Sequence, residues 1–345
     1  MKRFLMFLMA IVLLLSFAAC SNASQEDEAL NEVIDIGSGE EKEPEQEKQP
    51  EETPREEEKP SETPKEEEKP TETPEETPQE TPKEEEPKEE EPTPQEPQEE
   101  AIDYSKWIKV ASYNIKCLMF GTQLDAVAAE LKEIDADIVG FQEVDFNTNR
   151  SGPGNQIQMI AEAAGYPYWA FTKLMDFQGG QYGMGIISRY PIKESTDTAY
   201  VILAEGDHPR KFGRHVLDVN GRELVFYNTH MTLGTDAVNG AELKQVTNKM
   251  ANDDYAVLVG DMNMKPDNMG QYVNTKKVTV LNGGDDFTFS TPTFPAGKKP
   301  TSAIDNIVVT DTMDYYWNDN TGVGIEVSYT DNSDHNLIWT YVNFK

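Results

Sequence analysis

The chain has 345 residues and a formal net charge of −33, from 63 acidic and 30 basic residues. Residues 40–100 hold 27 Glu, 8 Lys or Arg and 13 of the 21 prolines, so this segment alone carries −19. Residues 101–345 carry −11, which disfavours a protein whose main task is to grip nucleic acid by neutralising phosphates. The two cysteines exclude a disulfide framework and a multi-cysteine zinc cluster.

Residues 1–20 have the layout of a secretory leader. Lys2 and Arg3 precede an apolar run that ends at Ala18 and is too short to span a membrane comfortably. The ending LSFAAC resembles a bacterial lipobox, which predicts lipidation of Cys20 and an anchored protein facing outward. The alternative is a soluble secreted protein cut near Ala19. If Cys20 is acylated, Cys117 is the only free thiol, and we expect it to be buried as a small hydrophobe.

Residues 21–101 are expected to form a disordered tether. Within them, residues 40–100 repeat a crude decapeptide of the type SETPKEEEKP and contain no aliphatic or aromatic side chain. Such a segment cannot bury enough apolar surface to offset its ordering entropy. Proline and repulsion between like charges predict a semi-rigid spacer that holds the following domain away from the cell surface.

Residues 102–345 are expected to form one catalytic domain, with no boundary inside it. Apolar runs of strand length alternate with three helical patterns, which predicts an α+β or α/β layered domain and not a helix bundle. The expected helices are 123–134, 155–164 and 237–250. The expected strands are 107–115, 137–141, 185–188, 223–229, 256–260, 304–310 and 337–342, with surface loops at 265–270 and 282–300.

Polar residues cluster at the ends of these strands, where α/β enzymes place active sites. Six such stations occur in chain order: SYNI at 112–115, GFQEV at 140–144, NTH at 228–230, GDMN at 260–263, IDNI at 304–307 and SDHN at 333–336. Between the second and third stations lies GMGIISRYP at 183–191. Two of the four histidines of the chain, His230 and His335, belong to this set.

In this order the stations resemble the endonuclease/exonuclease/phosphatase superfamily, the metal-dependent phosphoesterases related to DNase I, exonuclease III and bacterial sphingomyelinases. The resemblance covers about residues 107–344. It implies an α+β fold, the four-layer α/β/β/α sandwich of the DNase I type. It also implies a hydrolase that cleaves phosphodiester or phosphomonoester bonds with a Mg²⁺ or Mn²⁺ ion.

The resemblance also implies roles for individual residues. Glu143 would be the main metal ligand, with Asn114 beside it and Asp334 assisting. Asp261 would orient or deprotonate the attacking water. The phosphate and the charged transition state would be held by the remaining group: Asn263, His230, His335 paired with Asp305, and, less directly, Tyr182.

One departure from the family pattern concerns the substrate: Met184 stands where close relatives commonly carry an asparagine, which puts a substrate-facing amide in doubt. The substrate itself stays open between a small phosphate ester, a phospholipid head group and nucleic acid. An extracellular nuclease is therefore one alternative, and a catalytically silent surface binding protein is another. We expect a monomer that touches the membrane only through its lipid anchor, on the extracytoplasmic face.

Overall fold

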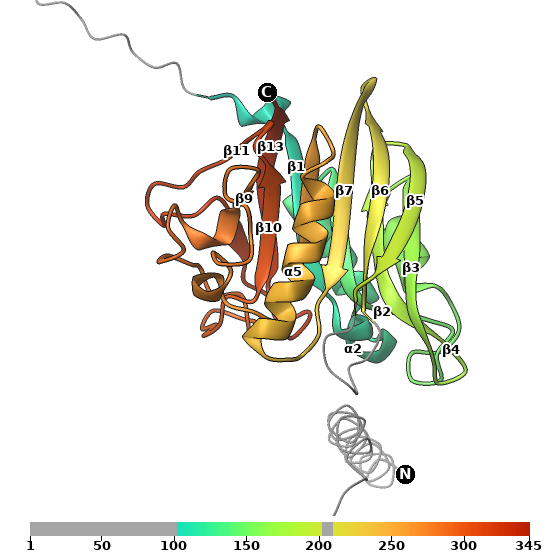
Figure 1. The fold of residues 1–345 in the computed structure, drawn as a ribbon. Coiled ribbons are helices and arrows are strands. Elements are labelled where there is room, and N and C mark those ends of the chain that lie inside the picture. Colours follow the sequence, from blue (N-terminus) through green and yellow to red (C-terminus); the bar gives the residue numbers. More distant parts are fainter. Residues whose placement is uncertain (1–101, 202–209) are drawn as a thin grey trace, which may run out of the picture. The chain divides into compact units, whose positions relative to one another are not determined.

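The computed structural model describes residues 102–201 and 210–345, which belong to one compact unit beginning at residue 101. The predicted leader, the lipidated Cys20 and the tether lie outside the described residues. Within the described part, no helix is both long and apolar enough to cross a membrane. Two β-sheets lie face to face in the centre of the domain (Figure 1).

The first sheet has seven strands in the order β11-β13-β1-β2-β4-β3, with β12 also pairing β13. Its central pair, β1 and β2, is parallel, so both strands end at the same edge of the sheet. The strand bounds are β1 Ile108–Asn114, β2 Ile138–Phe146, β3 Tyr168–Phe177, β4 Gly180–Ser188, β11 Met313–Tyr315, β12 Glu326–Ser328 and β13 Leu337–Phe344.

The second sheet has six strands in the order β5-β6-β7-β8-β10-β9. Here the parallel pair is β7 and β8, and β10 runs antiparallel to β8. The bounds are β5 Ile192–Ala199, β6 Lys211–Val219, β7 Arg222–His230, β8 Ala256–Asp261, β9 Val278–Val280 and β10 Asp305–Thr310.

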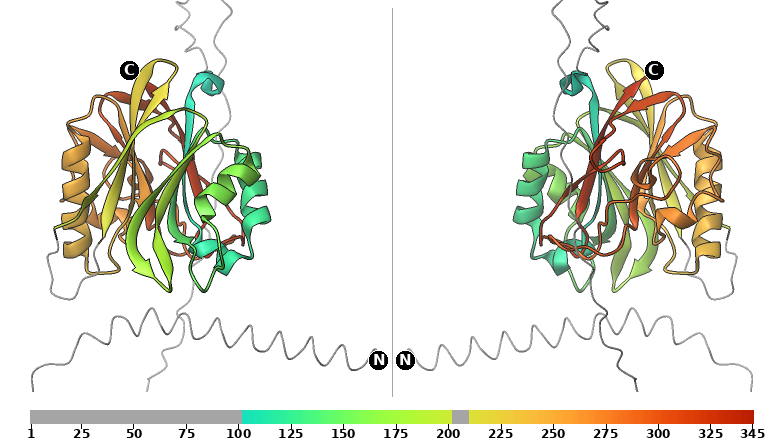
Figure 2. Two further views of the ribbon diagram at one scale, coloured as in Figure 1. Left: turned by 90° about the vertical axis from the view of Figure 1, so that its right-hand side faces the viewer. Right: turned by 90° about the vertical axis from the view of Figure 1, so that its left-hand side faces the viewer.

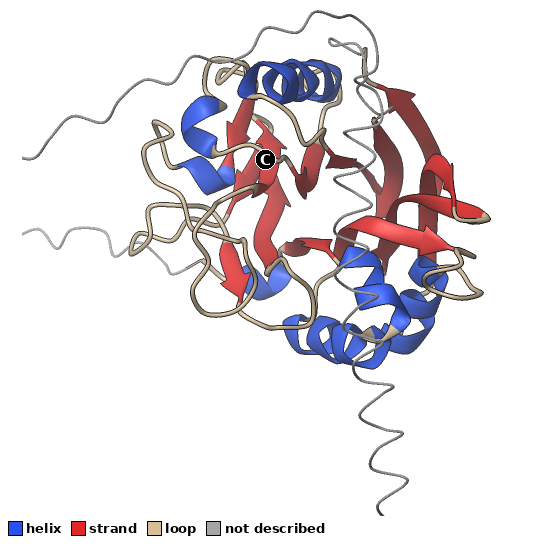
Figure 3. Cartoon of the chain, turned by 90° about the horizontal axis from the view of Figure 1, so that it is seen from below, coloured by secondary structure: helices blue, strands red, loops and turns tan. Residues whose placement is uncertain are grey.

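Helices cover the outer face of each sheet. On the first sheet lie α3 (Leu124–Ile134) and α4 (Gln156–Ala164), and on the second lies α5 (Asp236–Met250). The short elements are η1 (Tyr104–Lys106), α2 (Lys116–Gly121), η2 (Pro266–Asn268) and η3 (Leu281–Gly283). Seen edge-on and from below, the layers run helix, sheet, sheet, helix (Figures 2 and 3), so the predicted four-layer sandwich is confirmed.

The central strands read as continuous apolar runs because both of their faces are buried. In β1, Val110 points into the core between the sheets, whereas Ala111 and Tyr113 point into the core under α3 and α4. Gly140 of β2 allows the two sheets to approach closely, because a Cβ there would lie 2.4 Å from the side chain of Val259 on β8. This close approach brings the ends of β1 and β2 beside those of β7 and β8.

All seven predicted strands and all three predicted helices are present. The sequence patterns missed β3, β5 and β6, together with the three-residue strands. β5 is an exposed edge strand without the apolar alternation that identifies a half-buried strand. The predicted loop at 282–300 begins on a buried residue: Asn282 is fully buried and exchanges hydrogen bonds with Asn306 of β10.

Candidate active site

Three strands of the second sheet place His230, Asp261 and Asp305 in one row. His230 pairs in register with Asp261 across β7 and β8, and Asp305 pairs with Asp261 across β10 and β8. All three residues are buried. The Nε2 atom of His230 and the Nε2 atom of His335 each lie 3.6 Å from Asp261 Oδ2, so Asp261 sits at the centre of the group.

The first sheet contributes Asn114, from the end of β1, and Glu143 of β2. Glu143 has a left-handed backbone conformation with a φ of 56°, at a β-bulge where the register of β2 and β4 shifts between Phe141 and Val144. A bulge adds a residue to one strand and re-aims its side chain, which is a device common beside active sites. The Asn114 amide then joins the two sheets, because Nδ2 donates to Glu143 Oε1 at 2.9 Å and to Asp261 Oδ2 at 3.1 Å.

The protonation of Asp261 is set mainly by its burial. Burial raises the pKa of this carboxyl, and the nearby charge of Asp305 adds to the effect, while His335 opposes it. Its other oxygen, Oδ1, accepts the backbone N–H of Asn263 at 2.9 Å, which fixes the orientation of the carboxylate. A buried carboxylate with a raised pKa is a stronger base than an exposed one, which suits the removal of a proton from water.

His335 is clamped by Asp305. Its Nδ1 lies 3.1 and 3.0 Å from the two Asp305 oxygens, and Thr293 Oγ1 donates to Asp305 Oδ2 at 2.6 Å. Burial opposes a charge on the ring, but Asp305 and Asp261 outweigh it and raise the pKa of His335 to about 10. His335 is therefore an imidazolium at neutral pH and has a donor on each nitrogen.

Asp305→Asn should make this imidazolium much easier to deprotonate, because it removes one of the two negative charges that stabilise it. In an ¹⁵N NMR titration of the metal-free protein, we expect the pKa of His335 to fall from about 10 toward neutral. His215 is an internal control, since burial alone lowers its pKa to about 4 and its titration should not change. An unaltered His335 titration would contradict the pairing.

His230 differs from His335 in charge. Burial, followed by the charges of Arg210 and His335, lowers the pKa of His230 well below its ordinary value, so the ring is neutral at pH 7. A neutral imidazole retains one N–H with which to donate to a phosphate oxygen. Asn263, also predicted for this role, is partly buried, and its Nδ2 donates to the carbonyl of Met231 at 3.0 Å.

Tyr182 and Arg210 both lie within electrostatic range of Glu143. Burial and then the charge of Glu143 raise the pKa of Tyr182 well above its ordinary value, which keeps the phenol protonated. The positive charge of Arg210 lowers the pKa of Glu143, Tyr182 and His230. The Nε atom of Arg210 is buried and has no hydrogen-bond partner among the described residues. Arg210 was not predicted, because it precedes β6 outside all six stations; a lone arginine before a strand is no signal.

The segment that carries Asp334 and His335 is anchored by Glu130 of α3. This buried carboxylate accepts hydrogen bonds from Tyr113 Oη, Ser328 Oγ, Thr330 Oγ1 and Asn332 Nδ2, at 2.9 to 3.1 Å. Ser333 Oγ adds a bond of 2.7 Å to the carbonyl of Asn114. Glu130 thus holds in place the segment that leads to His335, although Glu130 itself lies outside the site. The periodicity of α3 does not predict this role.

Glu130→Gln should destabilise the domain and weaken catalysis together, because an amide cannot accept all four hydrogen bonds and its N–H₂ group opposes at least one donor. We expect the free energy of unfolding in urea to fall by about 2–4 kcal/mol, as for buried bonds to charged groups. Glu162→Gln is the matched control, because Glu162 is exposed on α4 and, among the described residues, accepts a hydrogen bond only from Gln158. Equal stabilities of the two variants would refute the anchoring role.

Two groups of residues compete as a metal site. Ligand atoms of Asp261, Asp305 and His335 lie within 4.8 Å of one another. However, an imidazolium has no lone pair for a metal, and here the charge of His335 already offsets one of the two carboxylate charges. Glu143 lies in a different environment. Burial, and then the charge of Asp334, raises the pKa of its carboxyl, because both disfavour the ionised form. A divalent cation would relieve that repulsion, so Glu143 and Asp334 fit a metal better.

Asn114 enters this site as a hydrogen-bond donor. Its amide nitrogen contacts both carboxylates, while its Oδ1 accepts the backbone N–H of Lys116 at 3.1 Å. Met184, which was suspected of altering a substrate contact, is fully buried in β4. Cys117 is buried as expected, and burial raises the pKa of its thiol.

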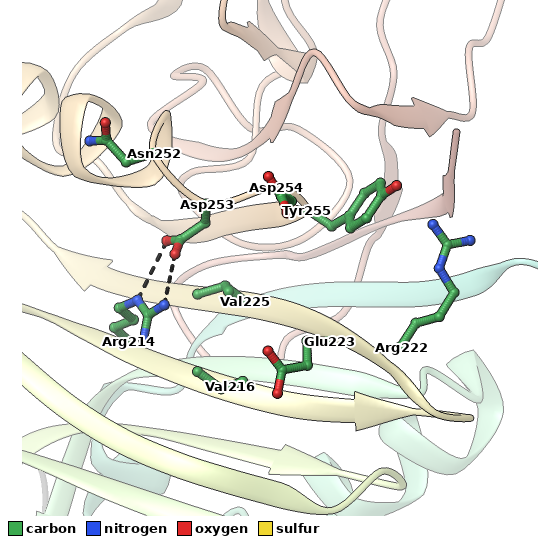
Figure 4. A pocket seen from close by; sticks show the side chains of 9 residues that line it. All are labelled: Arg214, Val216, Arg222, Glu223, Val225, Asn252, Asp253, Asp254 and Tyr255. Atoms are coloured by element: carbon green, nitrogen blue, oxygen red, sulfur yellow. Dashed lines mark hydrogen bonds and ion pairs between the residues drawn. The ribbon is translucent and has the colours of Figure 1, made fainter.

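A separate cavity of about 400 Å³ lies between β6, β7 and the turn after α5 (Figure 4). It contains Arg222 at the start of β7, whereas His230 lies at the other end of that strand. Its Arg214 is paired with Asp253, with Nη2 and Oδ1 2.7 Å apart. None of the predicted site residues lines this cavity.

Residues 111–335 match the Endonuclease/Exonuclease/phosphatase family. The chain belongs to this family. Its members are metal-dependent hydrolases of phosphoric esters, and the predicted enzyme class is thereby confirmed. A comparison with curated proteins gave no match.

Solved structures of this family share the fold. An endonuclease/exonuclease/phosphatase from Beutenbergia cavernae is 20% identical with a TM-score of 0.54, covering 69% of this chain and 71% of its own. The mannosyl-6-phosphatase of Bacteroides thetaiotaomicron is also 20% identical, with a TM-score of 0.52 over 69% and 100%. TDP2 of D. rerio, complexed with a single-strand DNA product, is 14% identical, with a TM-score of 0.53 over 69% and 99%.

Proposed function

We propose that this protein is a cell-surface, Mg²⁺-dependent phosphoesterase that hydrolyses small phosphate esters. The observation that carries the proposal is the central position of Asp261. Its carboxylate has Asn114, the Asn263 backbone and both site histidines around it, and Glu143 lies on the other side of Asn114. One base, one cationic ring and one pair of carboxylates for a metal therefore converge from both sheets.

In this proposal each residue has a separate task. Asp261 orients the attacking water and takes its proton. The imidazolium of His335, held by Asp305, stabilises the negative charge that develops on the phosphoryl oxygens, and neutral His230 donates a hydrogen bond to the same group. Tyr182 and Arg210 face the phosphate beside Glu143, and Asn263 holds the loop next to Asp261.

Glu143 and Asp334 would hold the metal. Mg²⁺ is the best candidate, because it prefers oxygen ligands, needs only one or two carboxylates and keeps positions for water and phosphate oxygens. When bound, a divalent ion supplies charge neutralisation at the phosphate and a polarised water or leaving oxygen. Mn²⁺ shares these preferences and is a practical probe of the site.

For the location, we propose a lipid anchor at Cys20 and an extended tether formed by residues 21–101. Support comes from the lipobox-like ending of the leader and from the Glu- and Pro-rich composition of the segment after it. A domain held outside the cell meets esters of its surroundings: phospholipid head groups, sugar phosphates or free nucleic acid. The charge of −11 on residues 101–345 favours small esters over long duplex DNA.

A side-by-side assay tests the proposal. Purified protein is incubated with a sugar phosphate, a small phosphodiester, sphingomyelin vesicles and plasmid DNA, each with Mg²⁺ and with EDTA. We expect Mg²⁺-dependent release of product from one or both small esters. Cleavage of DNA alone would overturn the small-ester assignment in favour of a nuclease. Cleavage of the vesicles alone would overturn it in favour of a lipid hydrolase, and no cleavage in any arm would favour a binding protein.

A further inference from the structure

Lys116 lies at the metal side of the active site, on the first residue of α2. Its Nζ is 2.7 Å from Asp334 Oδ2, and the two side chains are 39% and 30% exposed. Asn114 links this lysine to Glu143, because its Oδ1 accepts the backbone N–H of Lys116 at 3.1 Å and its Nδ2 donates to Glu143 Oε1 at 2.9 Å. An ammonium and two carboxylates therefore lie within electrostatic reach of one another at the place where the proposed function puts the metal.

The backbone is bent to bring Lys116 there. Residues 116–120 have φ values from 41° to 62°, so this turn is left-handed, a conformation that L-residues adopt only at a steric cost. Cys117 holds the turn in place, because its carbonyl accepts Gln156 Nε2 at 2.6 Å and its Sγ accepts Arg150 Nη2 at 2.9 Å. Leu118 anchors it further in the core. These contacts hold the strained turn, and with it Lys116, in one position.

We propose that the Lys116 ammonium serves as the fixed second cation of this site, so that the enzyme binds a single divalent metal ion. The charges support this count. Glu143 and Asp334 together carry two negative charges, which one divalent ion balances, and Lys116 then leaves one positive charge for the phosphate. A second metal beside Asp334 would have to displace an ammonium that is already in contact with the carboxylate, against strong repulsion between cations.

Lys116 can also donate to a substrate. An ammonium has three N–H donors in flexible geometry, so one can stay on Asp334 while another reaches a non-bridging phosphate oxygen. Together with the guanidinium of Arg210, it gives the site two positive charges around the phosphate. Such a concentration of charge favours a phosphomonoester dianion over a diester monoanion. This substrate preference rests on the proposed hydrolysis, whereas the metal count rests only on the proposed metal site at Glu143 and Asp334.

The test is a Mn²⁺-binding titration of the purified protein, followed by EPR of the free ion. The wild type should bind one ion per chain. Lys116→Met should bind the first ion roughly tenfold more tightly or better, because a neighbouring positive charge is lost and Asp334 is released. Lys116→Arg, which keeps the charge, should behave as the wild type. Lys193→Met is the matched control, since Lys193 pairs with Asp218 and Glu223 away from the site.

Two bound ions of similar affinity in the wild type would overturn the proposal, as would an unchanged or weakened affinity in Lys116→Met. The number of ions that the wild type binds tests the proposal even if the methionine variant does not fold. Because Mn²⁺ binding needs no substrate, the readout also separates the two claims. A protein that binds one ion with the expected variant pattern but hydrolyses no ester would sustain the Lys116 assignment and refute the proposed function.

Discussion

Asp261→Asn should lower kcat of ester hydrolysis by about 10²–10⁴-fold, the range expected when a general base is lost. The amide keeps an oxygen that can accept the Asn263 N–H, but it cannot take a proton from water. The raised pKa of Asp261, caused by its burial, is the property that the substitution removes. Initial rates at saturating substrate and Mg²⁺ measure the effect.

Two controls make that result specific. Asp261 is not among the residues proposed to hold the metal, so the Mn²⁺ affinity of Asp261→Asn should remain within a few-fold of the wild type. The thermal unfolding midpoint shows whether the variant is folded. A folded variant with turnover within tenfold of the wild type would rule out Asp261 as the base.

Glu143→Gln should raise the dissociation constant of the metal by about 10–100-fold or more, because a charged ligand becomes neutral. At millimolar Mg²⁺ we expect hydrolysis to fall correspondingly and to recover in part when Mg²⁺ is raised. Binding isotherms for Mn²⁺ measure the affinity directly, and the Mg²⁺ dependence of the rate supplies a second reading.

Glu133→Gln is the matched control, since Glu133 lies exposed on α3 and the same change there leaves the site intact. If Glu143→Gln keeps wild-type metal affinity, the metal belongs elsewhere, and the group formed by Asp261, Asp305 and His335 becomes the alternative. A loss of activity that no concentration of Mg²⁺ reverses would instead give Glu143 a role other than ligation.

The catalytic centre could be predicted because its residues directly flank buried strands. Asn114, His230 and Asp261 are the last residues of apolar runs, and Asp305 is the first of one. Sheet geometry then brings them together, since parallel strands end at one edge and an antiparallel neighbour begins there. Glu143 and His335 followed from the family order of the stations, and the structure brings both beside the same row.

The supporting residues could not be predicted in this way, because their roles depend on contacts that no local pattern records. Glu130 occupies an ordinary helical position, and only the fold brings the segment 328–332 to its carboxylate. Arg210 acts on the site from the residue before β6, a strand that the apolar pattern itself did not reveal. Lys116 depends on a left-handed turn of five residues, none of them glycine, which sequence preferences argue against.

Hydrolysis in H₂¹⁸O tests the central claim most directly, because it reports which bond water attacks. Wild-type protein with Mg²⁺ is given the ester that it cleaves fastest, and the products are weighed by mass spectrometry, with EDTA as the control. Attack of an Asp261-oriented water on phosphorus predicts one ¹⁸O atom in the phosphate product, none in the alcohol, and no turnover with EDTA. Label in the alcohol, or hydrolysis that continues in EDTA, would contradict a metal-assisted attack on phosphorus.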